Sequence, residues 1–138
     1  MKLLYMAMLV FAAGACMAHS PDITSLPEEP DCADISASAE LDDCMHEAIE
    51  TSRTLLSDEL VSFEKRARHV YAADQMLGQE FIDMVLEAQN AWVEFRDKSC
   101  KVDAFEVEKG APSYVTTVNG CIIRMNMERV EVLESLLR

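Results

Sequence analysis

Five cysteines in a chain of 138 residues constrain the fold more than any other feature, because short exported chains use cysteines as disulfide staples. An odd number leaves one cysteine outside the pairs. Cys16 ends an apolar run over residues 3–15 that follows Lys2. This run is too short to cross a bilayer, which needs about 20 residues, but it suits the core of a secretory signal. The sequence therefore predicts export, with Cys16 excluded from pairing.

Two routes of signal processing remain open. Small residues at the −3 and −1 positions allow ordinary cleavage before Cys16 or before His19, which gives a signal peptide over residues 1–18. Alternatively, the sequence 13–16 (Ala-Gly-Ala-Cys) is a lipobox, the lipoprotein signal covers residues 1–15, and Cys16 becomes lipidated. The first route predicts a periplasmic or secreted protein. The second predicts a lipid-anchored envelope protein, and we expect a membrane contact only in that case.

The charge of the chain is concentrated near its N-terminal end. The formal net charge is −13, from 25 acidic and 12 basic residues, and removal of the signal changes it to −14. Residues 19–50 contain ten of the acids and neither Lys nor Arg. Three prolines make residues 19–31 an acidic linker. This balance excludes nucleic acid as a partner, because nucleic-acid binding needs a basic surface.

Apolar residues at helical spacing predict two long helices in the first part of the domain. The first begins near Ser38 and carries an apolar stripe that only Ser52 interrupts: Met45, Ile49, Leu56, Leu60, Phe63, Ala67 and Val70. We expect a break over residues 74–78. The second helix carries Phe81, Val85, Ala88, Trp92 and Phe95, and it should fade between residues 105 and 109.

Gly110 and Pro112 mark the next turn, with Gly110 as a helix C-cap and Pro112 in a following first turn. The third helix carries Val115, Val118, Ile122, Met125, Leu133 and Leu136, although its first residues 115–118 have β propensity. The fold class is therefore all-α. We expect residues 32–138 to form a small antiparallel three-helix bundle with a disulfide-tied N-terminal arm.

Helix geometry predicts how the four remaining cysteines pair. Cys100 and Cys121 are equally far from the turn at residues 110–111, so an antiparallel helix pair brings them side by side. Cys44 could face Cys100 by the same argument, but it lies about 140° from the apolar stripe of its helix. Cys32 is therefore the expected partner of Cys44. A continuous helix would separate them by about 18 Å, so the arm must double back around residues 36–38.

The segment 88–100 carries Gln89, Trp92, Arg96, Asp97 and Cys100, and a turn with Gly110 then precedes Cys121 and Arg129. This pattern resembles the LprI-type lysozyme-inhibitor family of small exported bacterial envelope proteins. The resemblance covers roughly residues 31–137, and the spacing of Cys32 and Cys44 also matches. It implies export, disulfides, a helical fold and inhibition of lysozyme. The first helix departs from the family, which usually has Tyr, Asp and Leu-Asn where this chain has Ala48, Ser52 and residues 55–56 (Leu-Leu).

Three of the family-matched residues have expected structural roles. Trp92 should be a core aromatic, and Arg96 should lay its stem over that ring while its guanidinium meets a carboxylate, with Asp97 pointing away. Arg129 falls in the middle of the third apolar stripe. Because an unpaired buried charge costs several kcal/mol, we expect it to form an ion pair with an acid of the first or second helix.

The acidic residues are the expected partner-binding residues, namely Glu40, Asp42, Asp43 and Glu47. Animal lysozymes are basic, and a negative surface would steer such a partner. His19, His46 and His69 are scattered, so we expect no catalytic residues, no metal site and no cofactor. The leading hypothesis is an exported protein that binds a basic lysozyme-like glycosidase. The alternatives are a structural or assembly factor of the envelope without lysozyme inhibition and, least favoured, an enzyme acting on cell-wall material.

Overall fold

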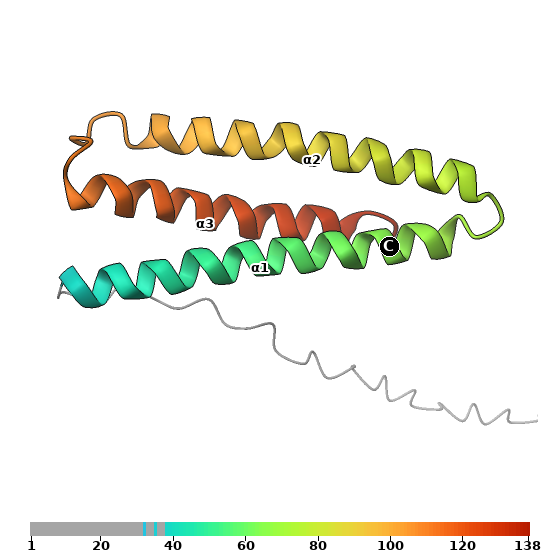
Figure 1. The fold of residues 1–138 in the computed structure, drawn as a ribbon, viewed down its shortest axis with the longest axis horizontal. Coiled ribbons are helices and arrows are strands. Elements are labelled where there is room, and N and C mark those ends of the chain that lie inside the picture. Colours follow the sequence, from blue (N-terminus) through green and yellow to red (C-terminus); the bar gives the residue numbers. More distant parts are fainter. Residues whose placement is uncertain (1–31, 33–34, 36–37) are drawn as a thin grey trace, which may run out of the picture.

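The computed structural model describes residue 32, residue 35 and residues 38–138 (Figure 1). The predicted signal segment, Cys16 and the linker over residues 19–31 lie outside the described residues. The bend expected around residues 36–38 also lies largely outside them. Within the described part of the chain, no helix is long and apolar enough to span a bilayer.

Three long helices form the fold, which confirms the all-α class: α1 (Ser38–Val70), α2 (Gln75–Asp103) and α3 (Pro112–Ser135). In Figure 1, α1 and α3 run in the same direction and α2 runs in the opposite direction. The described residues contain no strand. The segment 115–118 is helical despite its β propensity, because it belongs to a long helix packed on α1 and α2.

The turn between α1 and α2 is shorter than the predicted break over residues 74–78. Asp74 is the N-cap of α2, and its side chain accepts a hydrogen bond from the backbone N–H of Leu77 at 3.1 Å. Gly78 is buried inside α2 against Tyr71, and a Cβ at this position would lie 2.8 Å from the Tyr71 Cβ. This glycine therefore permits a close approach of α2 to the preceding turn, and the prediction that it ends the break is wrong.

The connection between α2 and α3 differs from prediction at one end and agrees at the other. α2 ends at Asp103 with Ala104 as its C-cap, so Gly110 is not a C-cap. Pro112 is the first residue of α3, as predicted, and its missing N–H is harmless in a first helical turn.

Three groups of buried apolar residues follow one another along the bundle. The first surrounds the Cys100–Cys121 disulfide and includes Ile49 and Ile122. The second contains Leu55, Leu56, Val130 and Leu133, and Trp92 packs against it. The third contains Phe63, Ala67 and Ile82 near the turn between α1 and α2. A core that is continuous along all three helices leaves few positions for polar side chains, so those that are buried need partners.

The core-facing side of α2 is the predicted one only in part. Phe81, Val85 and Trp92 are half-buried and pack against the core, as predicted. Phe95 and Ala88 are exposed, whereas Ile82, Gln89, Arg96 and Cys100 are buried. Val70 and Val115, which end or begin the other predicted stripes, are also exposed. The error on α2 arises because this helix carries apolar residues on two sides, and polar residues interrupt the buried one.

Two disulfides join the elements in the pairing that helix geometry predicts. Cys32 is bonded to Cys44 with a Cα–Cα distance of 6.0 Å, and Cys100 is bonded to Cys121 with a Cα–Cα distance of 5.4 Å. The first ties residue 32 to the start of α1, and the second joins α2 to α3 inside the core.

Candidate functional site

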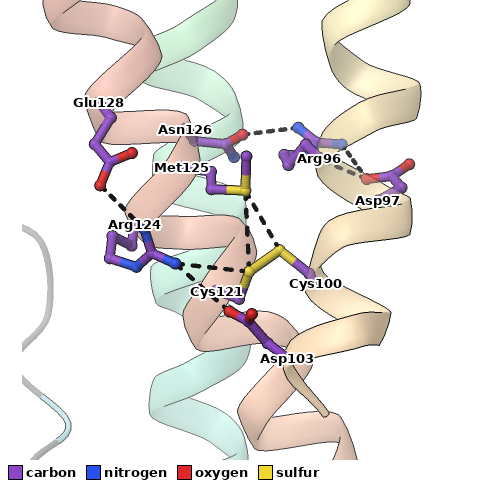
Figure 2. Close-up of a disulfide and its surroundings, with 9 residues drawn as sticks. All are labelled: Arg96, Asp97, Cys100, Asp103, Cys121, Arg124, Met125, Asn126 and Glu128. Carbon is purple, nitrogen blue, oxygen red and sulfur yellow. Dashed lines mark hydrogen bonds and ion pairs between the residues drawn. A yellow bond between two sulfur atoms is a disulfide. The ribbon is translucent and has the colours of Figure 1, made fainter. Parts of the chain in front are cut away.

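A buried chain of hydrogen bonds links all three helices beside the Cys100–Cys121 disulfide. Arg96 of α2 donates from Nη1 to Oδ1 of Asn126 on α3 at 2.7 Å (Figure 2). Asn126 donates from Nδ2 to the hydroxyl of Ser52 on α1 at 3.0 Å, and Ser52 donates to the carbonyl of Ile49 at 2.9 Å. Every donor has an acceptor in a place closed to water, so the chain fixes the three helices relative to one another.

Arg96 also meets the carboxylate that its buried charge requires. Its Nε and Nη2 both donate to Oδ1 of Asp97, at 2.9 and 2.7 Å. Its Cζ lies 5.4 Å from the centre of the Trp92 ring, which confirms the predicted contact. The prediction that Asp97 points away is only half right, because this half-exposed side chain turns back to Arg96 (Figure 2).

Arg129 has different partners from those predicted. Its Nε donates to Oε1 of Gln89 at 2.8 Å, and its Cζ lies 5.6 Å from the centre of the Trp92 ring. Among the described residues no carboxylate forms an ion pair with it, so the predicted ion pair with an acid of α1 or α2 is wrong. Burial lowers the pKa of the Arg129 guanidinium. An amide and an aromatic face take the place of the carboxylate.

Five family-matched residues therefore gather with Asn126 into one cluster around Trp92, which we call the tryptophan cluster: Gln89, Trp92, Arg96, Asp97, Arg129 and Asn126. Two guanidinium groups lie over one indole ring, and side-chain amides hold both. The half-buried Trp92 contributes to the core, as predicted. This arrangement can orient helices, and its buried members are closed to a protein partner.

Asn126 is the member of this cluster that sequence analysis missed, and Ser52 is the partner that it noted merely as an interruption of a stripe. Both are fully buried. In the first helix, the positions that depart from the resemblance are Ala48, Ser52, Leu55 and Leu56, and all four are buried. Ser52 on α1 and Asn126 on α3 each lie among apolar residues of a core-facing stripe. Two such polar residues on neighbouring helices could have suggested that they bond each other.

A second feature, on another face, is a stripe of acids on α1 that we call the acidic stripe: Glu40, Asp43, Glu47, Glu50 and Asp58. Their spacing places them within roughly 80° of one another around the helix axis. All five are exposed. Repeated negative charge on one side of a helix creates a surface that attracts a cationic partner.

The acidic stripe borders a groove of about 740 Å³ between α1 and α3. Leu55 of α1 and Val130 of α3 give the groove apolar lining. Its acidic lining residues are Glu47, Glu50, Asp58, Glu59 and Glu134. A groove with apolar and carboxylate lining suits a partner that presents both cationic and apolar side chains.

Ion pairs neutralise part of this groove. Arg66 bonds Glu59 at 2.7 Å and also donates to the carbonyl of Leu133 at 2.9 Å, near the end of α3. Arg53 pairs with Glu50. Within the described part of the chain, Glu47 and Asp58 form no ion pair. Glu134 pairs with Arg138, so Glu47 and Asp58 are the two groove acids without an ion-pair partner among the described residues.

The four predicted partner-binding residues do not all lie together. Glu40, Asp43 and Glu47 belong to the acidic stripe, and Glu47 also lines the groove. Asp42 instead lines smaller hollows between the starts of α1 and α3, with Pro112 and Thr116. Glu50, Asp58, Glu59 and Glu134 were not singled out from the sequence, because only the packing of α3 on α1 brings them to one groove.

Two of the three histidines lie in the described part of the chain, and they are far apart. His46 lines the acidic groove, whereas His69 lies at the other end of α1. No group of three or more His, Cys, Asp or Glu side chains in the described ranges could hold a metal ion.

The fold and site define a small disulfide-bonded helical domain with an acidic groove. The chain belongs to the LprI lysozyme-inhibitor family, because the family model described as Lysozyme inhibitor LprI matches residues 31–133. No curated protein and no solved structure matches the chain significantly. Membership confirms the resemblance seen in the segment 88–100, and at a coarse level it associates the fold with a protein partner.

Proposed function

We propose that this chain is an exported envelope protein that binds a basic lysozyme-like glycosidase and blocks its action on the cell wall. Family membership gives the class of partner. We place the contact with the glycosidase at the acidic groove between α1 and α3, and the proposal depends on this groove. The protein acts by covering its target and performs no reaction itself.

Charge complementarity is the first argument for this groove. Glu47 and Asp58 are exposed carboxylates without an ion-pair partner among the described residues. Each could therefore form an ion pair with a cationic side chain of the target. The pair therefore contributes to the encounter rate, the orientation and the affinity of the complex. The remaining affinity must come from apolar contact.

Leu55 and Val130, each more than nine-tenths buried, form an apolar floor at which such contact begins. Both residues line the groove, so a partner segment that enters it can bury apolar side chains beside the carboxylates. Glu59 is held by Arg66, which also bonds the end of α3, so this side of the groove is fixed before binding. A preformed groove reduces the ordering cost of association.

The test is inhibition of lysozyme during lysis of bacterial cell walls, with the mature chain from residue 19 added in increasing molar ratio. We expect lysis to stop near equimolar protein. Raising the ionic strength from about 0.05 to about 0.5 M should weaken the complex at least tenfold, because salt screens exposed charges.

Complete lysis at large molar excess of the protein would contradict the proposal and favour the alternative, a structural or assembly factor of the envelope. Release of soluble cell-wall fragments by the protein alone would contradict it in another way, since a binding protein turns over no substrate.

A further inference from the structure

α2 carries a second apolar stripe, on the side that faces away from the core. Its members are Met84, Ala88, Ala91, Phe95, Val102 and Phe105, and we call this stripe the outer seam. Phe105 lies just beyond the end of the helix at Asp103. The steps along the seam alternate between four and three residues, with Lys98 at the single missing place. This is the heptad spacing of a helix that packs along another helix.

The outer seam is exposed in the single chain. Met84 is 62% exposed, Phe95 60%, Val102 72% and Phe105 83%. Figure 1 shows α2 along one edge of the bundle, with α3 beside it and α1 beyond α3. Scattered exposed apolar residues are ordinary on soluble proteins, but a stripe in heptad register with a single interruption is not.

We propose that the outer seam of α2 is a self-association surface, through which two copies of this chain pair with their α2 helices antiparallel. The seam exposes on the order of 600 Å² per copy, so pairing buries on the order of 1,200 Å², which reaches the range of specific interfaces. The five seam residues on the helix, from Met84 to Val102, extend over about 27 Å, and Phe105 follows just beyond the helix end.

The charges beside the seam favour a second copy of the chain as the partner, with the two α2 helices antiparallel. Glu80, Glu87, Glu94 and Lys101 follow one edge of the seam at intervals of seven residues. In an antiparallel pair this edge of one helix faces the same edge of the other, which brings Lys101 of each copy beside glutamates of its partner. A parallel pair would place the same edge beside Val85, Trp92 and Ser99, where no opposite charge is available.

This surface is independent of the proposed lysozyme contact. The acidic groove lies between α1 and α3, whereas the seam lies on α2. Salt distinguishes lysozyme binding from dimerisation. A complex held by exposed charges weakens as ionic strength rises, whereas an apolar interface between two negative chains does not. Failure of either proposal therefore leaves the other unaffected.

The test is sedimentation equilibrium of the mature chain from residue 19. We expect a monomer–dimer equilibrium with a dissociation constant on the order of 10 μM, unchanged or tighter at high salt. Phe95→Glu with Val102→Glu should weaken dimerisation at least 30-fold, by about 2 kcal/mol or more of binding free energy. The matched control is Val115→Glu with Val132→Glu, two exposed valines of α3, which should leave it unchanged.

A charge exchange tests the direction of pairing. Lys101→Glu should weaken the dimer about threefold, and Glu87→Lys with Glu94→Lys in the same chain should restore it. Far-ultraviolet circular dichroism checks that each variant remains folded. A wild-type chain that stays monomeric at all concentrations would overturn the proposal. So would a dimer whose dissociation constant is the same in the seam double variant and in the α3 control double variant. A monomer that instead sediments with phosphatidylcholine vesicles would also overturn it and assign the seam to a lipid surface.

Discussion

Asn126 and Ser52 show how single polar residues acquire a structural role in a small core. Neither side chain has exposed surface. Asn126 donates a hydrogen bond to Ser52, and it accepts one from Arg96 of α2. A hydrogen bond to a charged group contributes more than a neutral one, so this contact should be energetically significant. Asp97 holds the other side of the same guanidinium at the edge of the core, where solvent weakens the ion pair.

Replacing Asn126 by Leu should therefore destabilise the protein more than neutralising Asp97. We expect Asn126→Leu to lower the free energy of unfolding by about 2 kcal/mol, because a buried guanidinium nitrogen loses its acceptor. Asp97→Asn should cost less than about 1 kcal/mol. Urea unfolding followed by circular dichroism measures both. A larger loss for Asp97→Asn would show that the ion pair, and not the buried amide, holds Arg96.

Arg129 has a role in the fold that its family match alone does not disclose. Arg129→Met removes the donor to Gln89 and one cation above the Trp92 ring, while it keeps a long apolar stem. We expect the free energy of unfolding to fall by about 1–2 kcal/mol, with lysozyme affinity of the folded protein unchanged. Unchanged or higher melting temperature together with lost lysozyme binding would make Arg129 a contact residue instead.

At the scale of elements, Gly78 sets how closely α2 approaches the turn before it. Gly78→Ala places a methyl group 2.8 Å from the Tyr71 Cβ, and the resulting shift should cost more than the helix propensity gained, about 1 kcal/mol. We expect a net loss of about 1–2 kcal/mol in thermal or urea unfolding. Gly110→Ala is the control, because no atom lies within 4 Å of its new Cβ and stability should stay the same or rise slightly. Equal losses for both variants would refute the close approach.

The three helices and both disulfides could be predicted because apolar spacing and helix geometry are local properties of the chain. The buried side of α2 could be predicted only in part, because the exposed Phe95 makes its outer side apolar too. The burial of Gln89 and Arg96 could not be predicted from α2 alone, because their hydrogen-bond partners, Arg129 and Asn126, lie on α3. The acidic groove also needed the structure, since Glu134 is far from Asp58 in sequence and joins it only through the packing of α3 on α1.

At the scale of the whole molecule, three features occupy separate places in the structure. The tryptophan cluster and the Cys100–Cys121 disulfide hold the helices together inside the bundle. The acidic groove lies between α1 and α3, and the outer seam lies on α2. The net charge of −13 therefore has a local meaning, because two unpaired carboxylates, Glu47 and Asp58, lie beside the apolar floor of one groove.

The most direct test of the proposed function compares lysozyme affinity between two variants that lose the same charge. Glu47→Gln with Asp58→Asn neutralises the groove, and Glu106→Gln with Glu108→Gln neutralises two exposed acids in the turn between α2 and α3. Titration calorimetry at low salt should show at least a tenfold loss for the groove variant, about 1.4 kcal/mol, and a change of less than about twofold for the turn variant. Equal losses in the two variants, or none in the groove variant, would contradict the assignment of the groove as the lysozyme-binding site.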